Sequence, residues 1–293
     1  MARDMRSITR TWERYSLILP ALLALAIVAV YPFIFGLIMS LRGATLANFR
    51  TAPWVGIANY SRLFADRLFW GSFSFTIRFV AAAVFFEVVL GTAVALFFYL
   101  APFPAKRFLF TGVMIPLMIA PIFYGVSLKL AFNSLYGIIP RLLGLFGFQI
   151  DFFSTPRSAF WTMVGIDVWQ WTSLVLLLVY AGLHSIPKET LEAATVDGAG
   201  WWQLISKILL PQILPIISVA GLLRAIDAFK VFDTIYVITG GGPGVSTRSA
   251  SLQIWYYTFA QFDLGKAAAY TIVFAFFVSF VAQIIMRRLI KEK

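Results

Sequence analysis

Six long apolar stretches, separated by short polar segments, limit the folds open to this chain. They cover residues 16–40, 73–100, 108–132, 159–182, 212–238 and 267–287. A helix needs ~20 mostly apolar residues to cross the hydrocarbon core of a bilayer. The stretches are too long and too uniformly apolar for the alternating strands of a transmembrane barrel. We therefore predict an all-α polytopic membrane protein with six transmembrane helices.

The amino-acid composition also indicates a protein that is surrounded by lipid rather than by water. Hydrophobic residues make up 60% of the 293 residues and charged residues 13%, whereas soluble domains carry about 25% charged residues. The first apolar stretch follows Arg3, Arg6, Arg10 and Arg14, and it is too long for the apolar region of a cleavable signal. It is predicted to be the first spanning helix, which starts on the cytoplasmic side.

Basic residues predict the orientation. With the N-terminus inside, the cytoplasmic segments hold twelve Lys and Arg residues and the outer loops eight, in the direction of the positive-inside rule. We predict a bacterial or archaeal inner-membrane protein with a cytoplasmic segment 1–15 and a transmembrane domain 16–290, both termini lying in the cytoplasm. The net charge of +11 is then explained by basic residues that set the orientation in the membrane and contact anionic lipid headgroups, rather than by binding to nucleic acid. The polar segment 183–211 falls in the cytoplasm and the Gly-rich loop 239–266 outside.

The cytoplasmic segment 183–211 is predicted to be a helix-turn-helix. Pro187 suits a first helical turn, and the acidic residues Glu189 and Glu192 suit the positive end of the helix dipole. Gly198 and Gly200 tolerate the backbone of a turn. A second short helix is expected from about residue 201 to 210, ending at Pro211, with two tryptophans suited to the membrane interface.

The same segment carries a pattern of residues at fixed spacing: Glu192-Ala193-Ala194, then Gly198, then Ile208-Leu209-Leu210-Pro211. It resembles the EAA loop of binding-protein-dependent ABC importer permeases, which have the type I importer (MetI-like) fold. Residues 54–64, with Gly56, Asn59 and Tyr60, and residues 229–243 are similar to segments of the carbohydrate-uptake branch, which includes the maltose permease.

The resemblance implies a non-catalytic subunit that works with a second permease, an ABC ATPase dimer and an extracytoplasmic solute-binding protein. ATP and Mg²⁺ would be bound by the ATPase, and no cofactor by this chain. In the family, the EAA loop docks in a cleft of the ATPase, with Glu192 as its charged anchor and the alanines allowing close approach. The coupling residues implied are Glu192, Ala193, Ala194, Asp197, Gly198, Ile208 and Pro211.

Polar residues inside the spans are candidates for a substrate site, because ionisable groups in lipid are costly. Asp167, Gln170, Trp171 and Leu174 follow a spacing of three and four and are predicted to share one helix face. A carboxylate, an amide and an indole together suit a sugar. The resemblance adds Asp227, Ala228 and Val231 in the fifth span as lining residues. The alternative for these residues is hydrogen bonding to the partner permease.

The cations within the spans leave the charge of the cargo open. Arg224, Asp227 and Lys230 lie on adjacent turns and allow an ion network within one helix. Arg224, Lys230 and Arg78 also keep an anionic cargo such as glycerol phosphate possible. Arg78 and Glu87 are nine residues apart and do not share a face.

Several other classes of protein are disfavoured. The chain has no cysteine and one histidine, His184, so thiolate chemistry and a histidine metal cluster are excluded. Residues 240–244 lack the Lys-Ser/Thr ending of a nucleotide-binding loop; Gly241, Gly242 and Pro243 are expected to contact the binding protein. A self-sufficient secondary transporter or channel is the main alternative, although we see no convincing internal repeat. A membrane-embedded enzyme is disfavoured because the sequence has no paired His/Asp or Ser/His residues at a reactive spacing.

Overall fold

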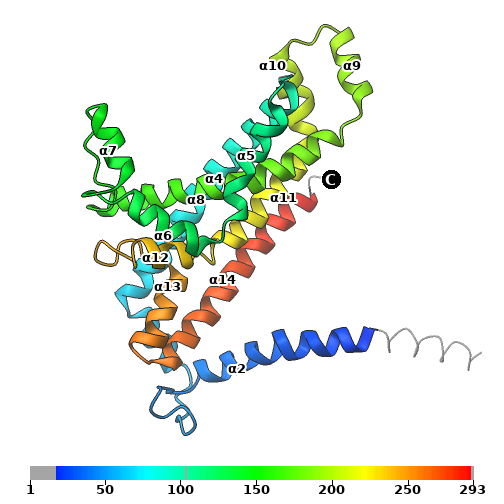
Figure 1. Ribbon diagram of the computed structural model, residues 1–293. Coiled ribbons are helices and arrows are strands. Elements are labelled where there is room, and N and C mark those ends of the chain that lie inside the picture. Colours follow the sequence, from blue (N-terminus) through cyan, green and yellow to red (C-terminus); the bar gives the residue numbers. More distant parts are fainter. Residues whose placement is uncertain (1–17, 103, 292–293) are drawn as a thin grey trace, which may run out of the picture. The chain divides into compact units, whose positions relative to one another are not determined.

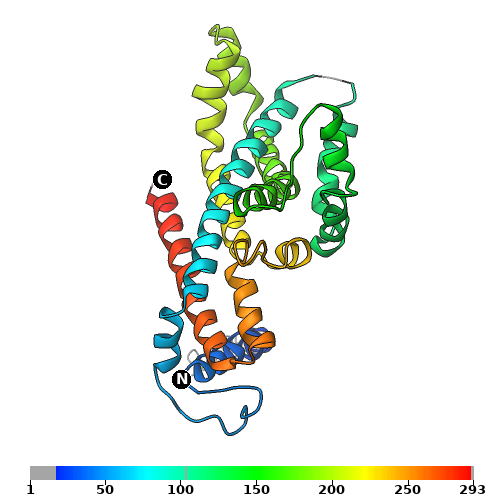
Figure 2. The same ribbon diagram turned by 90° about the vertical axis from the view of Figure 1, so that its left-hand side faces the viewer.

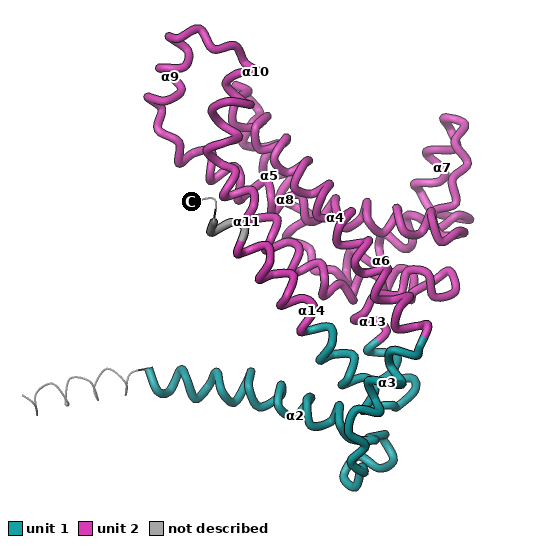
Figure 3. The backbone as a smooth tube through the Cα atoms, turned by 180° about the vertical axis from the view of Figure 1, so that it is seen from behind, with its two compact units in different colours: residues 1–66, 254–275 teal, residues 67–253, 276–293 magenta. Residues whose placement is uncertain are grey.

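The computed structural model describes residues 18–102 and 104–291, except for the side chains of residues 288–291. Within these residues every regular element is a helix, and two isolated β-bridges are the only strand pairing. The predicted all-α class is therefore confirmed. The chain divides into two compact units (Figure 3), which are described separately: unit 1 comprises residues 1–66 and 254–275, and unit 2 comprises residues 67–253 and 276–293.

Five helical segments are long and apolar enough to cross a membrane, and the number rises to six if a bent helix pair is counted as one span (Figure 1). The five are Ile18–Ser40, which contains η1 (Ala26–Val30) and α2 (Tyr31–Ser40); α4 (Arg67–Leu100); α8 (Pro156–His184); Trp201–Ala228; and Leu264–Arg287 of α14 (Leu264–Lys291). The bent pair is α5 (Lys106–Met118) and α6 (Pro121–Ala131). Shorter helices are α3 (Ala58–Phe64), α7 (Ile138–Leu145), α9 (Lys188–Val196), α12 (Asp233–Ile238), α13 (Ala250–Trp255) and η3 (Tyr256–Ala260).

The third predicted span, 108–132, is wrong as a single straight helix. α5 and α6 meet at 98° across a break at Ile119 and Ala120, both of which have extended backbone angles. Pro116 lies inside α5 and Pro121 occupies the start of α6. A proline removes a helical hydrogen bond and disfavours helical angles at the residue before it, so the two prolines explain the bend.

The fifth predicted span, 212–238, is displaced toward the N-terminus. α10 (Trp201–Gln203), the π-helical η2 (Leu204–Leu209) and α11 (Leu210–Ala228) form one continuous helix, after which residues 229–232 separate it from α12. Pro211 therefore does not end a helix, contrary to the prediction. It follows directly on a π-helical turn, whose wider backbone is a common place for a helix to accommodate an irregular residue.

The core of unit 2 is built by close contact of α4, α8 and α11. A Cβ atom added at Gly91 on α4 would lie 2.7 Å from Val175 Cβ on α8. One added at Gly182 on α8 would lie 2.5 Å from Ile216 Cδ1 on α11. Small residues let transmembrane helices approach closely enough to pack through van der Waals contact. These two glycines therefore set the spacing of the three helices.

Unit 1 explains the Gly-x-x-Asn-Tyr segment. Gly56 has φ +57°, which turns the chain into α3. The buried Asn59 donates from Nδ2 to the carbonyl oxygens of Ser40 (2.7 Å) and Arg42 (2.8 Å) at the end of α2, and Tyr60 Oη lies 2.7 Å from Ser40 Oγ. The last carbonyls of a helix have no partner inside the helix, so this segment caps the first spanning helix.

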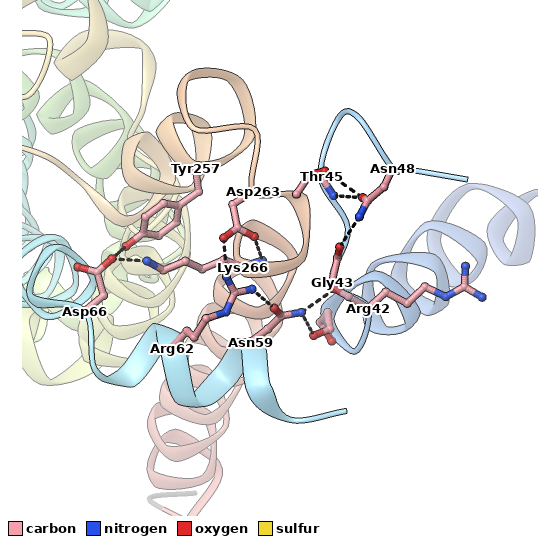
Figure 4. A network of polar contacts seen from close by, with 11 residues as sticks. Arg42, Gly43, Thr45, Asn48, Asn59, Arg62, Asp66, Tyr257, Asp263 and Lys266 are labelled. Carbon is pink, nitrogen blue, oxygen red and sulfur yellow. Dashed lines mark hydrogen bonds and ion pairs between the residues drawn. The ribbon is translucent and has the colours of Figure 1, made fainter. Parts of the chain in front are cut away.

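The cap continues into a polar network that reaches α14 (Figure 4). Arg62 donates to Asn59 Oδ1 and lies 3.0 Å from Asp263 Oδ2. Lys266 pairs with Asp66, which also accepts from Tyr257 Oη at 2.7 Å. Within unit 1, the end of the first span and the start of the last span are therefore held together by hydrogen bonds.

Candidate functional site

A buried ion cluster joins three spanning helices of unit 2. Arg224 on α11 is 1% exposed and lies between Glu87 on α4 and Asp167 on α8, which are equally buried. Arg224 Nε is 2.6 Å from Glu87 Oε2, an ion pair without hydrogen-bond alignment. Arg224 Nη2 is 3.1 Å from Glu87 Oε1 and 2.5 Å from Asp167 Oδ2. Charged groups in a spanning helix require partners, and in this cluster the arginine and the two acids neutralise one another.

The cluster extends from the buried arginine toward an open surface. Arg224 Nη1 lies 3.2 Å from Asp227 Oδ2, and Asp227 Oδ1 lies 3.1 Å from Lys230 Nζ. The side chain of Asp227 is 41% exposed and that of Lys230 68%. The Arg224 guanidinium carbon also lies 4.7 Å from the centre of the Trp171 ring, a cation–π contact. Arg224, Asp227 and Lys230 thus form the ion network that their spacing allowed, and it reaches two further helices.

A cavity of about 240 Å³ adjoins the open side of this cluster. It combines acidic and basic side chains with an indole ring and a few apolar residues. The lining residues are Pro121, Asp167, Trp171, Arg224, Asp227, Ala228, Lys230, Val231, Phe232, Asp233 and Thr234.

Five of the seven residues predicted to line a substrate site line this cavity, namely Asp167, Trp171, Asp227, Ala228 and Val231. Gln170 and Leu174 do not. Successive helical residues are rotated by about 100°, so Gln170 points well away from Trp171. Gln170 Nε2 instead donates to the carbonyl oxygen of Ile119 at 3.0 Å, at the break between α5 and α6. Gln170 therefore contacts the backbone at this break and does not line the cavity.

Glu87 is the site residue that the sequence reasoning missed. The nearest cation along its own helix is Arg78, nine residues away, but the cation that pairs with Glu87 is Arg224 on α11. Arg78 is exposed, and its Nε donates to the Ser74 carbonyl oxygen at 3.3 Å. The sequence does contain a feature that could have identified Glu87: it is a single acidic residue in a long apolar stretch. Such a residue requires a cationic partner, and the partner can come from another span.

A second, larger cavity of about 630 Å³ lies between α6, α7 and α8. Its α8 wall presents Trp161, Gly165 and Trp169, which are four residues apart and so share a face. A Cβ atom added at Gly165 would meet no atom within 4 Å. The glycine thus leaves open space between two indole rings.

The segment after α8 forms the predicted helix, turn and helix. α9 has Pro187 at its N-cap and Glu189 in its first turn, and Gly198 turns the chain with φ +75°. Gly200 then precedes the long helix that begins at Trp201. The segment projects beyond the ends of α8 and α11 at one end of unit 2 (Figures 1 and 2).

The two arms of this segment enclose a cavity of about 460 Å³. It brings together five of the seven predicted coupling residues: Ala193, Ala194, Asp197, Ile208 and Pro211. Glu192 is exposed outside that lining, and the turn residue Gly198 is also exposed. Residues far apart along the segment therefore meet in one hollow surface with an acid beside it.

The Gly-rich loop is held by hydrogen bonds within itself. Gly241 N–H donates to Thr239 Oγ1 at 3.1 Å, and Thr247 Oγ1 lies 2.6 Å from the Gly242 carbonyl oxygen. Gly241 is buried, whereas Gly244 and Val245 are exposed at the tip. The loop thus presents a fixed shape.

Within the described residues, no group of three or more His, Cys, Asp or Glu side chains could hold a metal ion. His184 is the last residue of α8, and its Nδ1 lies 2.9 Å from the Tyr180 carbonyl oxygen.

Comparison with known proteins gives consistent results. The family model for the inner membrane component of binding-protein-dependent transport systems matches residues 87–292. The trehalose/maltose transport system permease protein MalF of Thermococcus litoralis is 36% identical, with 86% of each chain covered. The sn-glycerol-3-phosphate transport system permease protein UgpA of Shigella flexneri is 32% identical, covering 96% of this chain and 95% of its own.

Solved structures show the same fold. A chain of a bacterial ABC transporter that imports the acidic polysaccharide alginate superposes with a TM-score of 0.84 over 99% of both chains, at 22% identity. A chain of the alginate transporter bound to its periplasmic protein superposes with a TM-score of 0.80, covering 97% of this chain and 94% of that one.

Proposed function

Because the chain belongs to the family of inner membrane components of binding-protein-dependent transport systems, we propose that it is the permease subunit of an ATP-driven sugar importer. It pairs with a second permease, and a separate ATPase dimer binds ATP and Mg²⁺ and supplies the energy. An extracytoplasmic binding protein delivers the solute. The observation that carries this proposal is the α9–Gly198–α10 segment, which projects from the ends of two spanning helices.

The coupling segment has the features needed to receive an ATPase. A helix held at both ends by spanning helices moves with them as a rigid body, which suits alternating access. In our proposal the exposed Glu192 anchors the ATPase, and the 460 Å³ cavity beside Ala193, Asp197 and Ile208 receives an apolar side chain. Gly198 keeps α9 at its angle. In this proposal both chain termini and residues 183–211 lie in the cytoplasm.

The solute path follows the polar cavity of about 240 Å³. Asp167, Asp227 and Lys230 offer hydrogen bonds to hydroxyl groups, and Trp171 supplies an aromatic wall. The indoles of Trp161 and Trp169 extend the aromatic surface in the larger cavity. Polar groups that fix orientation beside aromatic walls are typical of small-molecule sites. A sugar or sugar-like solute fits this combination, and a trehalose/maltose permease is among the relatives.

The binding protein would meet the outer loop at residues 241–245. Gly241, Gly242 and Pro243 shape the turn, and its exposed tip at Gly244 and Val245 offers the contact. A loop held by its own hydrogen bonds loses little entropy on binding.

The proposal is tested by reconstituting the chain with its ATPase, second permease and binding protein in liposomes. Glu192→Arg should abolish ATP-dependent sugar uptake, while Glu189→Arg, a matched exposed acid on α9, should retain most of it. Both variants should insert normally. Uptake that persists in Glu192→Arg, or uptake by this chain without an ATPase, would contradict the proposal.

A further inference from the structure

We propose that Glu87 is a specificity-determining residue: by holding Arg224, it keeps the polar cavity closed to anions and selective for uncharged solutes. This inference rests on the proposed function, because it concerns the solute in that cavity. Relatives leave the question open, since they include permeases of a trehalose/maltose system and of an sn-glycerol-3-phosphate system.

Carboxylates already occupy most of the positions at which Arg224 could bind an anion. A guanidinium offers five N–H groups in a planar fork. Glu87 takes the edge formed by Nε and Nη2, at 2.6 and 3.1 Å, and Asp167 takes Nη2 at 2.5 Å. Asp227 lies 3.2 Å from Nη1, and one face of the plane covers Trp171. A phosphate or carboxylate that bound through two N–H groups on one edge of the guanidinium would have to displace one of these carboxylates.

The remaining charges of the cavity also oppose an anion. Three aspartates, Asp167, Asp227 and Asp233, line the cavity together with Arg224 and Lys230. Lys230 is paired with Asp227 at 3.1 Å. Glu87 lies behind the lining and adds a further carboxylate to those around Arg224. Charge interactions strengthen away from water, so surplus carboxylates repel an entering anion.

The other cation that could serve an anionic cargo is outside this site. Arg78 does not line the cavity and is exposed on α4. Three cations had left an anionic cargo such as glycerol phosphate possible. Arg224 is held by Glu87 and Asp167, Lys230 is paired with Asp227, and Arg78 lies outside the cavity. The cavity as built suits neutral hydroxyl-rich molecules.

Removing the charge of Glu87 should therefore create an anion site. Glu87→Gln keeps the size and an acceptor oxygen but releases the guanidinium from one of its carboxylates. Sulfate is the probe, titrated against the purified assembled transporter at constant ionic strength with chloride as the reference. Binding to the folded state raises the apparent Tm. We expect sulfate to raise the Tm of Glu87→Gln by about 2–4 °C in a saturable manner.

Matched variants assign the effect to this site. The wild type and the double variant Glu87→Gln/Arg224→Gln should show no saturable sulfate shift. Asp227→Asn removes a half-exposed carboxylate from the same arginine and should also gain a sulfate response, which keeps the test available if Glu87→Gln does not fold. In uptake assays, sn-glycerol 3-phosphate should inhibit Glu87→Gln at least several-fold more strongly than the wild type.

Three outcomes would overturn the inference. The wild type could show a sulfate shift that Arg224→Gln removes, which would mean that Arg224 is available to anions. A folded Glu87→Gln variant could show no shift, or its shift could persist in the double variant. The melting assay needs neither ATP nor transport, so its failure is distinguishable from failure of the proposed function, which would show as loss of ATPase coupling.

Discussion

Arg224 on α11 and Glu87 on α4 are 137 residues apart in the sequence and meet as a two-point ion pair, at 2.6 and 3.1 Å, with neither side chain more than 1% exposed. The pair joins two spanning helices, and Asp167 brings in a third. Arg224 and Asp167 also line the polar cavity, and Glu87 lies behind them.

Removing the arginine should destabilise the protein. Arg224→Met leaves Glu87 and Asp167 buried without their cation, and breaking a buried ion pair costs about 3–5 kcal/mol. We expect a clear fall in the apparent Tm of the purified transporter. Lys230→Met is the control, because an exposed pair contributes about 0–1 kcal/mol. Equal Tm values for the two variants would show that the cluster does not hold the helices.

The contact of α4 with α8 depends on Gly91. Gly91→Ala would place a methyl group 2.7 Å from Val175 Cβ, and overpacking of this kind costs about 1–3 kcal/mol. Gly71→Ala on the same helix meets nothing within 4 Å, and it should be neutral or stabilising because alanine favours helix. Thermal melting of both variants checks the prediction, which fails if Gly91→Ala is as stable as Gly71→Ala.

The turn of the coupling segment requires a glycine at one position only. Gly198 has φ +75°, whereas Gly200 has φ −68° and open space for a Cβ atom. A left-handed backbone costs a non-glycine residue about 1–2 kcal/mol. Gly198→Ala should therefore reduce ATP-dependent uptake several-fold, while Gly200→Ala should have little effect. Measured uptake that is the same in both variants would refute the role of the turn.

The cap on the first spanning helix depends on the two N–H groups of Asn59. Asn59→Asp replaces these donors by an acceptor beside the Ser40 and Arg42 carbonyl oxygens, and a lost buried hydrogen bond of this kind costs about 1–3 kcal/mol. Asn48→Asp is the control: it keeps the acceptor for Thr45 N–H at 2.7 Å and loses one donated bond, to the Gly43 carbonyl oxygen at 3.1 Å, where Asn59→Asp loses two, so it should cost less. Comparable Tm losses would contradict the cap.

Much of the architecture could be predicted from hydropathy, because helices are the economical way to satisfy the backbone in lipid. The bend at Ile119 and the π-helical turn before Pro211 could not, because a proline in a sequence does not show whether a helix ends, bends or adjusts its winding. The turn at Gly198 was predictable, since glycine is suited to positive φ.

The site was predictable only in part. Spacing along one helix placed Asp167 and Trp171 together, but it could not show that Gln170 bonds to the Ile119 carbonyl oxygen outside the cavity. Glu87 was missed because its partner lies on another helix, and one sequence alone does not show which spans are neighbours. The roles of Glu192 and Gly198 were predicted from the resemblance to a family. In the structure Glu192 lies on the short helix α9, and Gly198 forms the turn that follows it.

The central claim is that the coupling segment receives an ATPase subunit, and cysteine labelling tests it most directly. The chain has no native cysteine, so Val196→Cys and Val245→Cys each introduce a single thiol at an exposed position. Val196 lies four residues after Glu192 on α9 and so shares its face, and its replacement leaves Glu192 in place. With a maleimide applied to inside-out membrane vesicles, Val196→Cys should label rapidly without the ATPase and at least several-fold more slowly in the assembled transporter. Val245→Cys, labelled from the outer side, should be unaffected by the ATPase. Equal labelling rates at Val196→Cys with and without the ATPase would contradict the account.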